Sequence, residues 1–215
     1  MEQLYDPRGR RKYLTEPERN RFLKAARSTD TPVRAFCEVS AFTGCRLSEA
    51  LALTPERVDP AAGFLVFESL KKRRRGVFRA IPVPSGLLET LARRQLRNAR
   101  YGSTARLWSW SRATAWRRVR QVMRPAELSG AAATPKGLRH SFGILGVVAA
   151  VPLTLIQKWM GHSDVSTTAI YLDVSGDAER LIAIRMWQEV LRPEPLIARF
   201  WSAPKAMTKP GEHVR

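Results

Sequence analysis

The chain has 215 residues, of which 44% are hydrophobic, so it can bury a substantial core and is not an intrinsically disordered protein. Its formal charge of +18, from 37 Lys and Arg against 19 Asp and Glu, favours a polyanionic partner, and nucleic acid before all others. The sequence contains no run of about 18 apolar residues and no apolar signal segment, which argues against a membrane partner and against export.

In chain order, a short basic arm at residues 1–12 precedes the first helix signal. Thr15 with Glu18 three residues later matches the capping box, in which each side chain satisfies a backbone N–H of the other residue. Pro17 lies in the first turn, where proline fits a helix start. The pattern therefore predicts a helix over about 16–27.

The remaining elements follow from apolar periodicity and from glycine, serine, threonine and proline at the element ends. Helices are predicted over 31–43, in a short turn through 51, over 85–98, after a cap at Ser111, and over 135–150, 152–160 and 177–191; strands are predicted over 63–70 and 77–83, around the loop 71–76. Residues 13–191 are thus expected to form one mostly α domain with a small antiparallel β-hairpin, an α+β fold. Residues 192–215 are expected to form a flexible tail.

Both cysteines, Cys37 and Cys45, fall in apolar helical surroundings. Such cysteines are typical of buried thiols in a reducing compartment. We therefore expect a cytoplasmic location of the bacterial type.

Two arginines lie in apolar surroundings, where a charge is seldom placed without a partner. Arg46 follows a helix end and has Glu49 three residues on, a spacing that also suits a simple ion pair at a helix junction. Arg139 begins an almost wholly apolar stretch of helix, with Lys136 on the same face. A guanidinium can donate to two phosphate oxygens at once, so two of them on separate helices could clamp the charge that grows during phosphoryl transfer.

Three segments occur in an order that resembles the catalytic domain of the tyrosine recombinases, the phage integrase family. "TGCRLSEAL" is similar to the family's first box, "LRHSFG" to its second, and "WMGHSDVSTTAIY" to its third box and nucleophile. The resemblance covers about residues 13–190. It implies the tyrosine recombinase catalytic fold and an enzyme that breaks and rejoins DNA strands at specific sites, in integration, inversion or resolution.

The resemblance also implies roles for individual residues. Tyr171, whose surroundings alone favour a packed core residue, would attack the scissile phosphate and form a 3′-phosphotyrosyl link. Arg46 and Arg139 would hold the phosphorus, and His162 would hydrogen-bond a non-bridging oxygen. A hairpin lysine would protonate the leaving 5′ oxygen; Lys71 aligns best, with the adjacent Lys72 left open. Glu49 is interpreted as a residue that orients Arg46.

Two features depart from the family pattern. Lys136 stands where the family has a histidine, so the group that accepts the Tyr171 proton is left open. His140 follows Arg139 but points about 100° away around the helix, and it is interpreted as a packed histidine. The chain also lacks the N-terminal DNA-grasping domain that many members carry, so grip on DNA is expected from the arm and from the catalytic face.

Further basic residues are predicted to contact DNA. They are the hairpin residues Lys72, Arg73, Arg74 and Arg75, and Arg117 and Arg120 on the helix after Ser111. On that helix the stripe Trp116, Val119 and Met123 is interpreted as core rather than as a platform for stacking bases. In the family a segment beyond the tyrosine packs into a neighbouring protomer, so the last helix is expected to dock either on its own domain or within a homotetramer on double-stranded DNA sites.

No cofactor is expected, and no metal, because three histidines and no acidic cluster at ligand spacing leave two-metal chemistry without ligands. Two rival functions stay open. A type IB topoisomerase shares the Tyr–Arg–Arg chemistry, and a non-catalytic DNA-binding regulator would share the charge. The DNA site itself is not readable from the sequence.

Overall fold

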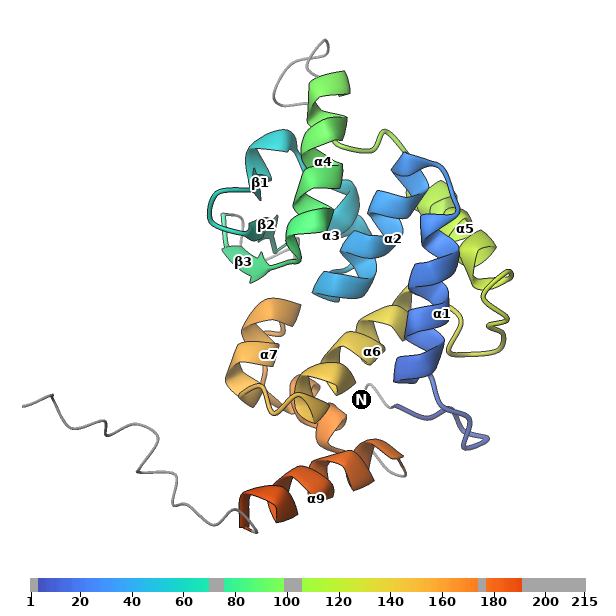
Figure 1. The fold of residues 1–215 in the computed structure, drawn as a ribbon, viewed down its shortest axis with the longest axis vertical. Helices are drawn as coiled ribbons and strands as arrows, with labels where there is room; N and C mark the ends of the chain where they lie inside the picture. The colour runs from blue at the N-terminus through green and yellow to red at the C-terminus, as the bar shows by residue number, and fades with distance from the viewer. Residues whose placement is uncertain (1–3, 70–75, 99–105, 174–176, 191–215) are drawn as a thin grey trace, which may run out of the picture.

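The computed structural model describes residues 4–69, 76–98, 106–173 and 177–190, which form a mostly helical domain with one small sheet (Figure 1). The helices are α1 (Glu16–Arg27), α2 (Thr31–Thr43), α3 (Leu47–Leu51), α4 (Ser85–Asn98), α5 (Arg112–Met123), α6 (Pro135–Val148), α7 (Leu153–Met160), α8 (Ser166–Ala169) and α9 (Asp177–Val190), with the 3₁₀ turns η1 (Pro55–Arg57) and η3 (Ile170–Leu172). The strands are β1 (Val58–Asp59), β2 (Phe64–Glu68) and β3 (Phe78–Pro82). The predicted fold class is confirmed.

Local side-chain signals account for most of the helix starts. The capping box of Thr15 and Glu18 is present at α1, and the side chains of Ser111 and Thr134 accept backbone N–H groups at the starts of α5 and α6. Ser85, predicted as a cap, is instead the first residue of α4. The bonded caps satisfy N–H groups that a helix end leaves without an intrahelical partner.

The sheet has three antiparallel strands in the order β1-β2-β3, one more than the predicted hairpin. Sequence reasoning missed β1 because its two residues are too few to show an alternating pattern. In the β2–β3 register Leu65 pairs with Ile81 and Phe67 with Arg79, and all four side chains are buried. Arg79 therefore points into the domain from the same sheet face as three apolar residues.

Two hydrophobic cores lie on either side of the middle of the molecule. The larger core joins α1, α2, α3, α4, α5 and the sheet; the smaller one joins the N-terminal segment, α6, α7 and η3, with Ile182 of α9 packed against it. Figure 1 shows this division, with α6, α7 and α9 below α2, α3 and α4. Elements from both halves therefore meet along the face between the two cores.

The N-terminal segment is folded onto the domain. Leu4 is buried in the smaller core, Tyr5 pairs with Arg11 in a β-bridge, and Arg11 forms an ion pair with Glu18. Arg10 is paired with Asp6 in the same way. Residues 4–12 of the predicted basic arm therefore pack on the domain, because their apolar residues have a core to join.

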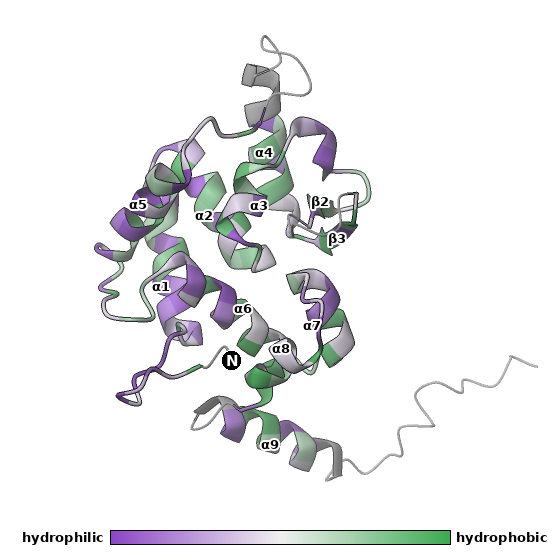
Figure 2. Ribbon diagram, turned by 180° about the vertical axis from the view of Figure 1, so that it is seen from behind, coloured by the Kyte–Doolittle hydropathy of each residue, from purple (hydrophilic) through white to green (hydrophobic). Residues whose placement is uncertain are grey.

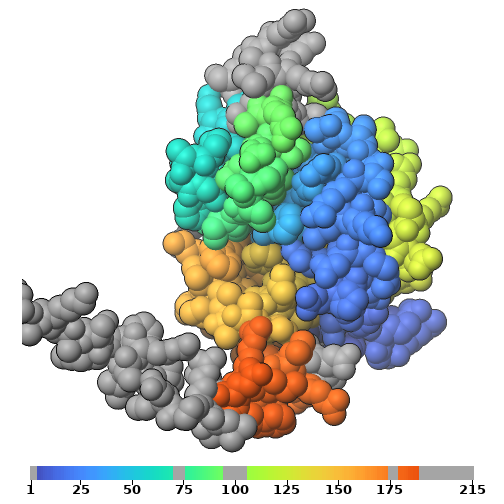
Figure 3. Space-filling view, viewed as in Figure 1, coloured from blue at the N-terminus to red at the C-terminus, as the bar shows by residue number. Residues whose placement is uncertain are grey.

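The last described helix, α9, packs against α6 of its own chain, and Figure 3 shows it directly below α6 at the lower edge of the molecule. It leaves Leu181, Met186 and Trp187 exposed. The predicted tail 192–215 lies outside the described residues. In the described part of the chain, no helix has the length and apolar character to cross a membrane.

Candidate active site

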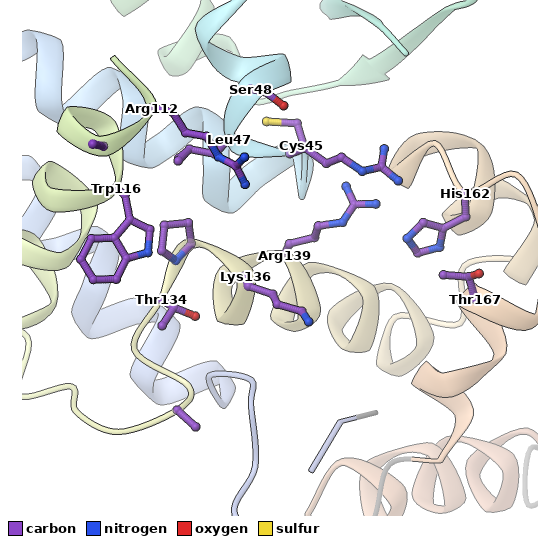
Figure 4. A pocket seen from close by; sticks show the side chains of 14 residues that line it. Cys45, Leu47, Ser48, Arg112, Trp116, Thr134, Lys136, Arg139, His162 and Thr167 are labelled. Carbon is purple, nitrogen blue, oxygen red and sulfur yellow. The ribbon is translucent and has the colours of Figure 1, made fainter. Parts of the chain in front are cut away.

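An open pocket of about 920 Å³ lies where the two halves meet. Arg46, Lys136, Arg139 and His162 line it, so four of the predicted catalytic residues share one cavity. Figure 4 shows Arg112 and Trp116 of α5 at one end, His162 and Thr167 at the other, and Arg139 with Lys136 between them.

Arg46 immediately precedes α3 and reaches across to the other half of the molecule. Its Nη1 donates to Glu49 Oε1 at 2.9 Å, and Nη1 and Nη2 both lie 3.3 Å from the carbonyl oxygen of Gly161. The expected ion pair with Glu49 is therefore present, and it does not withdraw Arg46 from the pocket.

Arg139 makes the reciprocal crossing from α6. Its Nη1 donates to the carbonyl of Gly44 at 2.6 Å, and its Nη2 donates to the carbonyl of Met160 at 2.7 Å. Burial, together with the nearby charge of Arg46, lowers the pKa of Arg139 to about 10. Because a guanidinium carries five N–H groups, these bonds occupy only part of its donors. Arg46 and Arg139 repel each other because both are positively charged, so an anion between them is favoured.

Two left-handed glycines supply carbonyls that hold these arginines. Gly44 ends α2 with φ of +57°, and Gly161 ends α7 with φ of +64°. A side chain at Gly44 would also collide with the ring of Phe142, at 2.6 Å. Carbonyls at a helix C-terminus carry partial negative charge, so both turns attract a guanidinium.

His162 directly follows Gly161 and is buried, with its Nδ1 2.9 Å from Thr168 Oγ1. That bond fixes the orientation of the imidazole, which borders the pocket. Lys136 is exposed on the first turn of α6, one turn from Arg139 on the pocket side. It brings another positive charge to the cavity.

Tyr171 lies on η3 with its side chain fully buried, and it does not line the pocket. Its ring stacks on His162 with 6.3 Å between the centroids, and its hydroxyl lies 3.4 Å from His140 Nδ1. His140 is buried, as expected of a packed histidine, and it lies beside the predicted nucleophile rather than in the pocket lining. The 100° turn from Arg139 to His140 points His140 at η3, which packs against the adjoining face of α6.

Glu49 accepts hydrogen bonds from the backbone and side chain of Arg46, and Arg79, which sequence reasoning missed, holds Glu49. Burial by itself raises the pKa of Glu49, but the charge and hydrogen bonds of Arg79 and the contacts of Arg46 outweigh it and hold that pKa below its ordinary value. Arg79 Nη2 lies 2.5 Å from Glu49 Oε2. The only sequence signal was an arginine at an inward position of the strand between apolar neighbours.

The predicted DNA contacts divide into three groups. Lys71, Lys72 and Arg73 to Arg75 lie outside the described residues. Arg117 is exposed on α5, which is mostly hydrophilic along its length (Figure 2). Arg120 instead donates to the carbonyl of Ala133 at 2.5 Å, so it ties α5 to the segment before α6.

The stripe on α5 is only partly core. Val119 and Met123 are buried as expected, but Trp116 is 45% exposed at the end of the pocket, with Arg120 over its ring. Trp116 is displaced from the core because α5 turns only its Ala115, Val119, Val122 and Met123 face inward. Cys37 and Cys45 are buried free thiols, as predicted.

Within the described part of the chain, no three His, Cys, Asp or Glu side chains are grouped as metal ligands would be. Catalysis without a metal or cofactor stays a prediction.

Comparison with known proteins supports the resemblance to the tyrosine recombinases independently of the pocket geometry. The profile of the Phage integrase family matches residues 12–177. Tyrosine recombinase XerA of Pyrococcus furiosus is 29% identical over 171 residues, which cover 76% of this chain and 58% of the relative. The crystal structure of XerA recombinase superimposes with a TM-score of 0.69 at 25% identity, over 85% of this chain and 66% of that one. XerH site-specific recombinase bound to its difH substrate gives a TM-score of 0.67 at 21% identity, over 85% of this chain and 59% of that one.

The chain thus spans about three fifths of the length of the XerA relative. The family profile runs from the segment before α1 to the start of α9 and includes every residue of the pocket. The chain belongs to the phage integrase family, the tyrosine recombinases.

Proposed function

We propose that the chain is a site-specific recombinase that cleaves and rejoins DNA strands through a 3′-phosphotyrosyl intermediate. The observation that carries the proposal is the convergence of Arg46 and Arg139, from different halves of the fold, on one open pocket with Lys136 and His162. Such a set of donors suits a phosphodiester whose charge increases in the transition state. The tyrosine recombinase relatives support the same reaction.

In this reaction the Tyr171 oxygen forms a bond to phosphorus, and the bond from phosphorus to the 5′ oxygen breaks. Arg46 and Arg139 stabilise the five-coordinate phosphorus, and His162 and Lys136 donate to its oxygens. Lys71 gives a proton to the leaving 5′ oxygen, with Lys72 as the alternative. Rejoining reverses these steps, so the bond energy is kept in the phosphotyrosyl link.

The buried position of Tyr171 adds a step before attack. Because its side chain has no exposed surface, the hydroxyl must move towards the pocket to meet a phosphate. His140 is the basic group that its hydroxyl contacts in the described arrangement, at 3.4 Å. We therefore assign His140 as the first acceptor of the Tyr171 proton. In the family pattern this role would fall to the histidine of the second box, whose place Lys136 takes in this chain.

DNA binds across the pocket mouth in this proposal. The exposed Arg112 and Arg117 of α5 extend the positive surface beyond the clamp, and the exposed Trp116 lies on the same helix. The protein works as a homotetramer on paired double-stranded sites, within the bacterial nucleoid. The exposed Leu181, Met186 and Trp187 of α9 favour a contact with a neighbouring protomer in addition to the packing of α9 on its own α6.

The test uses nicked suicide duplexes that carry the inverted or direct repeats flanking the gene, so that the freed end diffuses away after cleavage. Wild-type protein should leave a covalent adduct on a denaturing gel in the presence of EDTA. Tyr171→Phe removes only the hydroxyl, so it should fold and bind DNA but form no adduct. Arg46→Ala and Arg139→Ala should each lose about 10²–10³-fold in cleavage rate, as for a lost oxyanion donor.

Tyr13→Phe is the matched control, because Tyr13 is also buried in the smaller core but its hydroxyl lies 3.3 Å from the hydroxyl of Tyr5 in the N-terminal segment. It should keep wild-type cleavage. An adduct that survives in Tyr171→Phe would show that another residue is the nucleophile. Relaxation of supercoils without bridging of two sites in a gel assay would favour a topoisomerase instead.

A further inference from the structure

Arg79 is a buried charge outside the pocket, and the catalytic roles proposed above do not use it. It is the second residue of β3, and its side chain is 5% exposed. An arginine is almost never buried this deeply without specific partners, because removing its charge from water is costly in free energy. Its partners therefore indicate what the position is for.

The main partner of Arg79 is Glu49, on α3. Nη2 lies 2.5 Å from Oε2, and Nη1 lies 3.4 Å from Oε1. The same carboxylate accepts the Arg46 backbone N–H at 2.9 Å through Oε2 and the Arg46 guanidinium through Oε1. Glu49 thus bridges a buried arginine that faces the core and a half-exposed arginine that faces the pocket.

Arg79 also contacts the turn that carries His162. Its Nε donates to the carbonyl of Trp159 at 2.8 Å, and its guanidinium packs so closely on Gly161 that an added Cβ would lie 2.9 Å from it. Gly161 is the residue whose carbonyl accepts from Arg46. A third contact runs to Ser69 Oγ, at 3.4 Å, on the residue after β2.

We propose that Arg79 is a positioning residue for the phosphate clamp. It keeps Glu49 charged and in place so that Glu49 aims Arg46, and it locks the Gly161 turn against the same carboxylate. Since Ser69 is two residues from Lys71, the foot of the predicted lysine loop is tied to the same group. The inference rests on the proposed function, because it assigns Arg79 a part in preparing that site for cleavage.

The physical consequence concerns the ionisation of Glu49. Its surroundings are the guanidinium groups of Arg79 and Arg46, the more distant Arg139, and the buried Cys45 thiol. Without Arg79, the effect of burial is opposed only by the contacts of Arg46, so the pKa of Glu49 should rise. A protonated Glu49 no longer attracts Arg46, and misplacement of a catalytic group by about 1 Å can cost about 10²-fold in rate.

The experiment compares wild type, Arg79→Gln, Arg79→Lys, Glu49→Gln and the double variant Arg79→Gln/Glu49→Gln. Single-turnover cleavage of the suicide duplex is measured from about pH 5 to 8, along with DNA affinity and thermal unfolding. Arg79→Gln should bind DNA almost as wild type does but cleave about 10- to 100-fold more slowly. Its rate should rise with pH more steeply than the wild-type rate does, and the double variant should lose that added rise.

Arg57→Gln is the matched control, because Arg57 also pairs with a glutamate of the sheet, Glu68 at 2.9 Å, but has no contact with the clamp. It should keep the wild-type rate and pH profile. Arg79→Lys keeps the charge but not the planar fork, so its rate should fall between wild type and Arg79→Gln with little added pH dependence. If Arg79→Gln does not fold, the cleavage rate of Arg79→Lys tests the proposal instead. A wild-type rate in that variant would contradict the need for a planar guanidinium at this position.

A purely structural role predicts lower stability with an unchanged pH profile, and that result would overturn the inference. A cleavage rate in Arg79→Gln equal to that of Arg57→Gln would overturn it as well. Failure of the proposed function looks different, because wild-type protein would then form no adduct at Tyr171 at any pH.

Discussion

Gly143 on α6 lies against the ring of Tyr171, so a methyl group at this position tests whether the tyrosine occupies its buried position. A Cβ there would lie 2.5 Å from Cε2 and 2.6 Å from Cδ2 and Cζ of Tyr171. Ordinary carbon contacts are about 3.5–4.0 Å, so the ring must shift by about 1 Å. Overpacking of this kind costs about 1–3 kcal/mol, while alanine in place of glycine returns about 1 kcal/mol of helix propensity. Gly143→Ala should therefore lower the free energy of unfolding by about 0–2 kcal/mol.

Gly86→Ala on α4 is the control, because an added Cβ there meets nothing within 4 Å. It should leave stability unchanged or raise it by up to about 1 kcal/mol. The gap between the two variants, up to about 3 kcal/mol, corresponds to a difference of up to about 12 °C in Tm for a chain of this size.

Two assays follow the change. Thermal and denaturant unfolding give the stability gap, and nitration of tyrosines followed by peptide mass mapping gives the accessibility of Tyr171. Tyr171 should resist nitration in wild type and in Gly86→Ala, and it should react faster in Gly143→Ala because the ring has been displaced. Equal Tm shifts in both variants, with Tyr171 still protected, would refute the packing of Tyr171 on α6.

Three further outcomes are expected. The pKa of Glu49 is lowered in the folded state from an ordinary 4.5, so its stabilisation is present above that pH and is lost as pH falls through the folded pKa; Glu49→Gln should flatten the acid side of the curve of unfolding free energy against pH. Burial raises the pKa of Cys37 far above its usual range and that of Cys45 to about 11, so a disulfide reagent at neutral pH should modify both only when denaturant unfolds the chain; a fast native reaction would contradict their burial. Trp116→Ala should weaken binding of a duplex that holds one protomer by about 5- to 150-fold if the indole stacks on a base, while Trp187→Ala, also exposed but on α9, should bind as wild type does.

The sequence by itself determined several helix starts, and it indicated two arginines that line the pocket. Capping by Thr15, Ser111 and Thr134 involves N–H groups within three residues, so it is readable without any knowledge of the fold. Arg46 and Arg139 were readable for a different reason. A guanidinium in an apolar stretch of sequence needs a partner wherever the chain folds, and this requirement marks the position before the partner is known.

Only the tertiary structure decided which groups face one another across the two cores. Arg79 and Glu49 are 30 residues apart, and Tyr171 and His140 are 31 apart, so neither pairing leaves a local pattern. The exposure of Trp116 had the same origin, because a helical period shows which residues share a face but not how wide a strip of that face the neighbouring helices cover. The burial of Tyr171 likewise depends on Gly143, which admits the ring only because α6 and η3 pack together. Contacts of this kind depend on which faces meet, and that is settled by the packing of the whole domain rather than by any single segment.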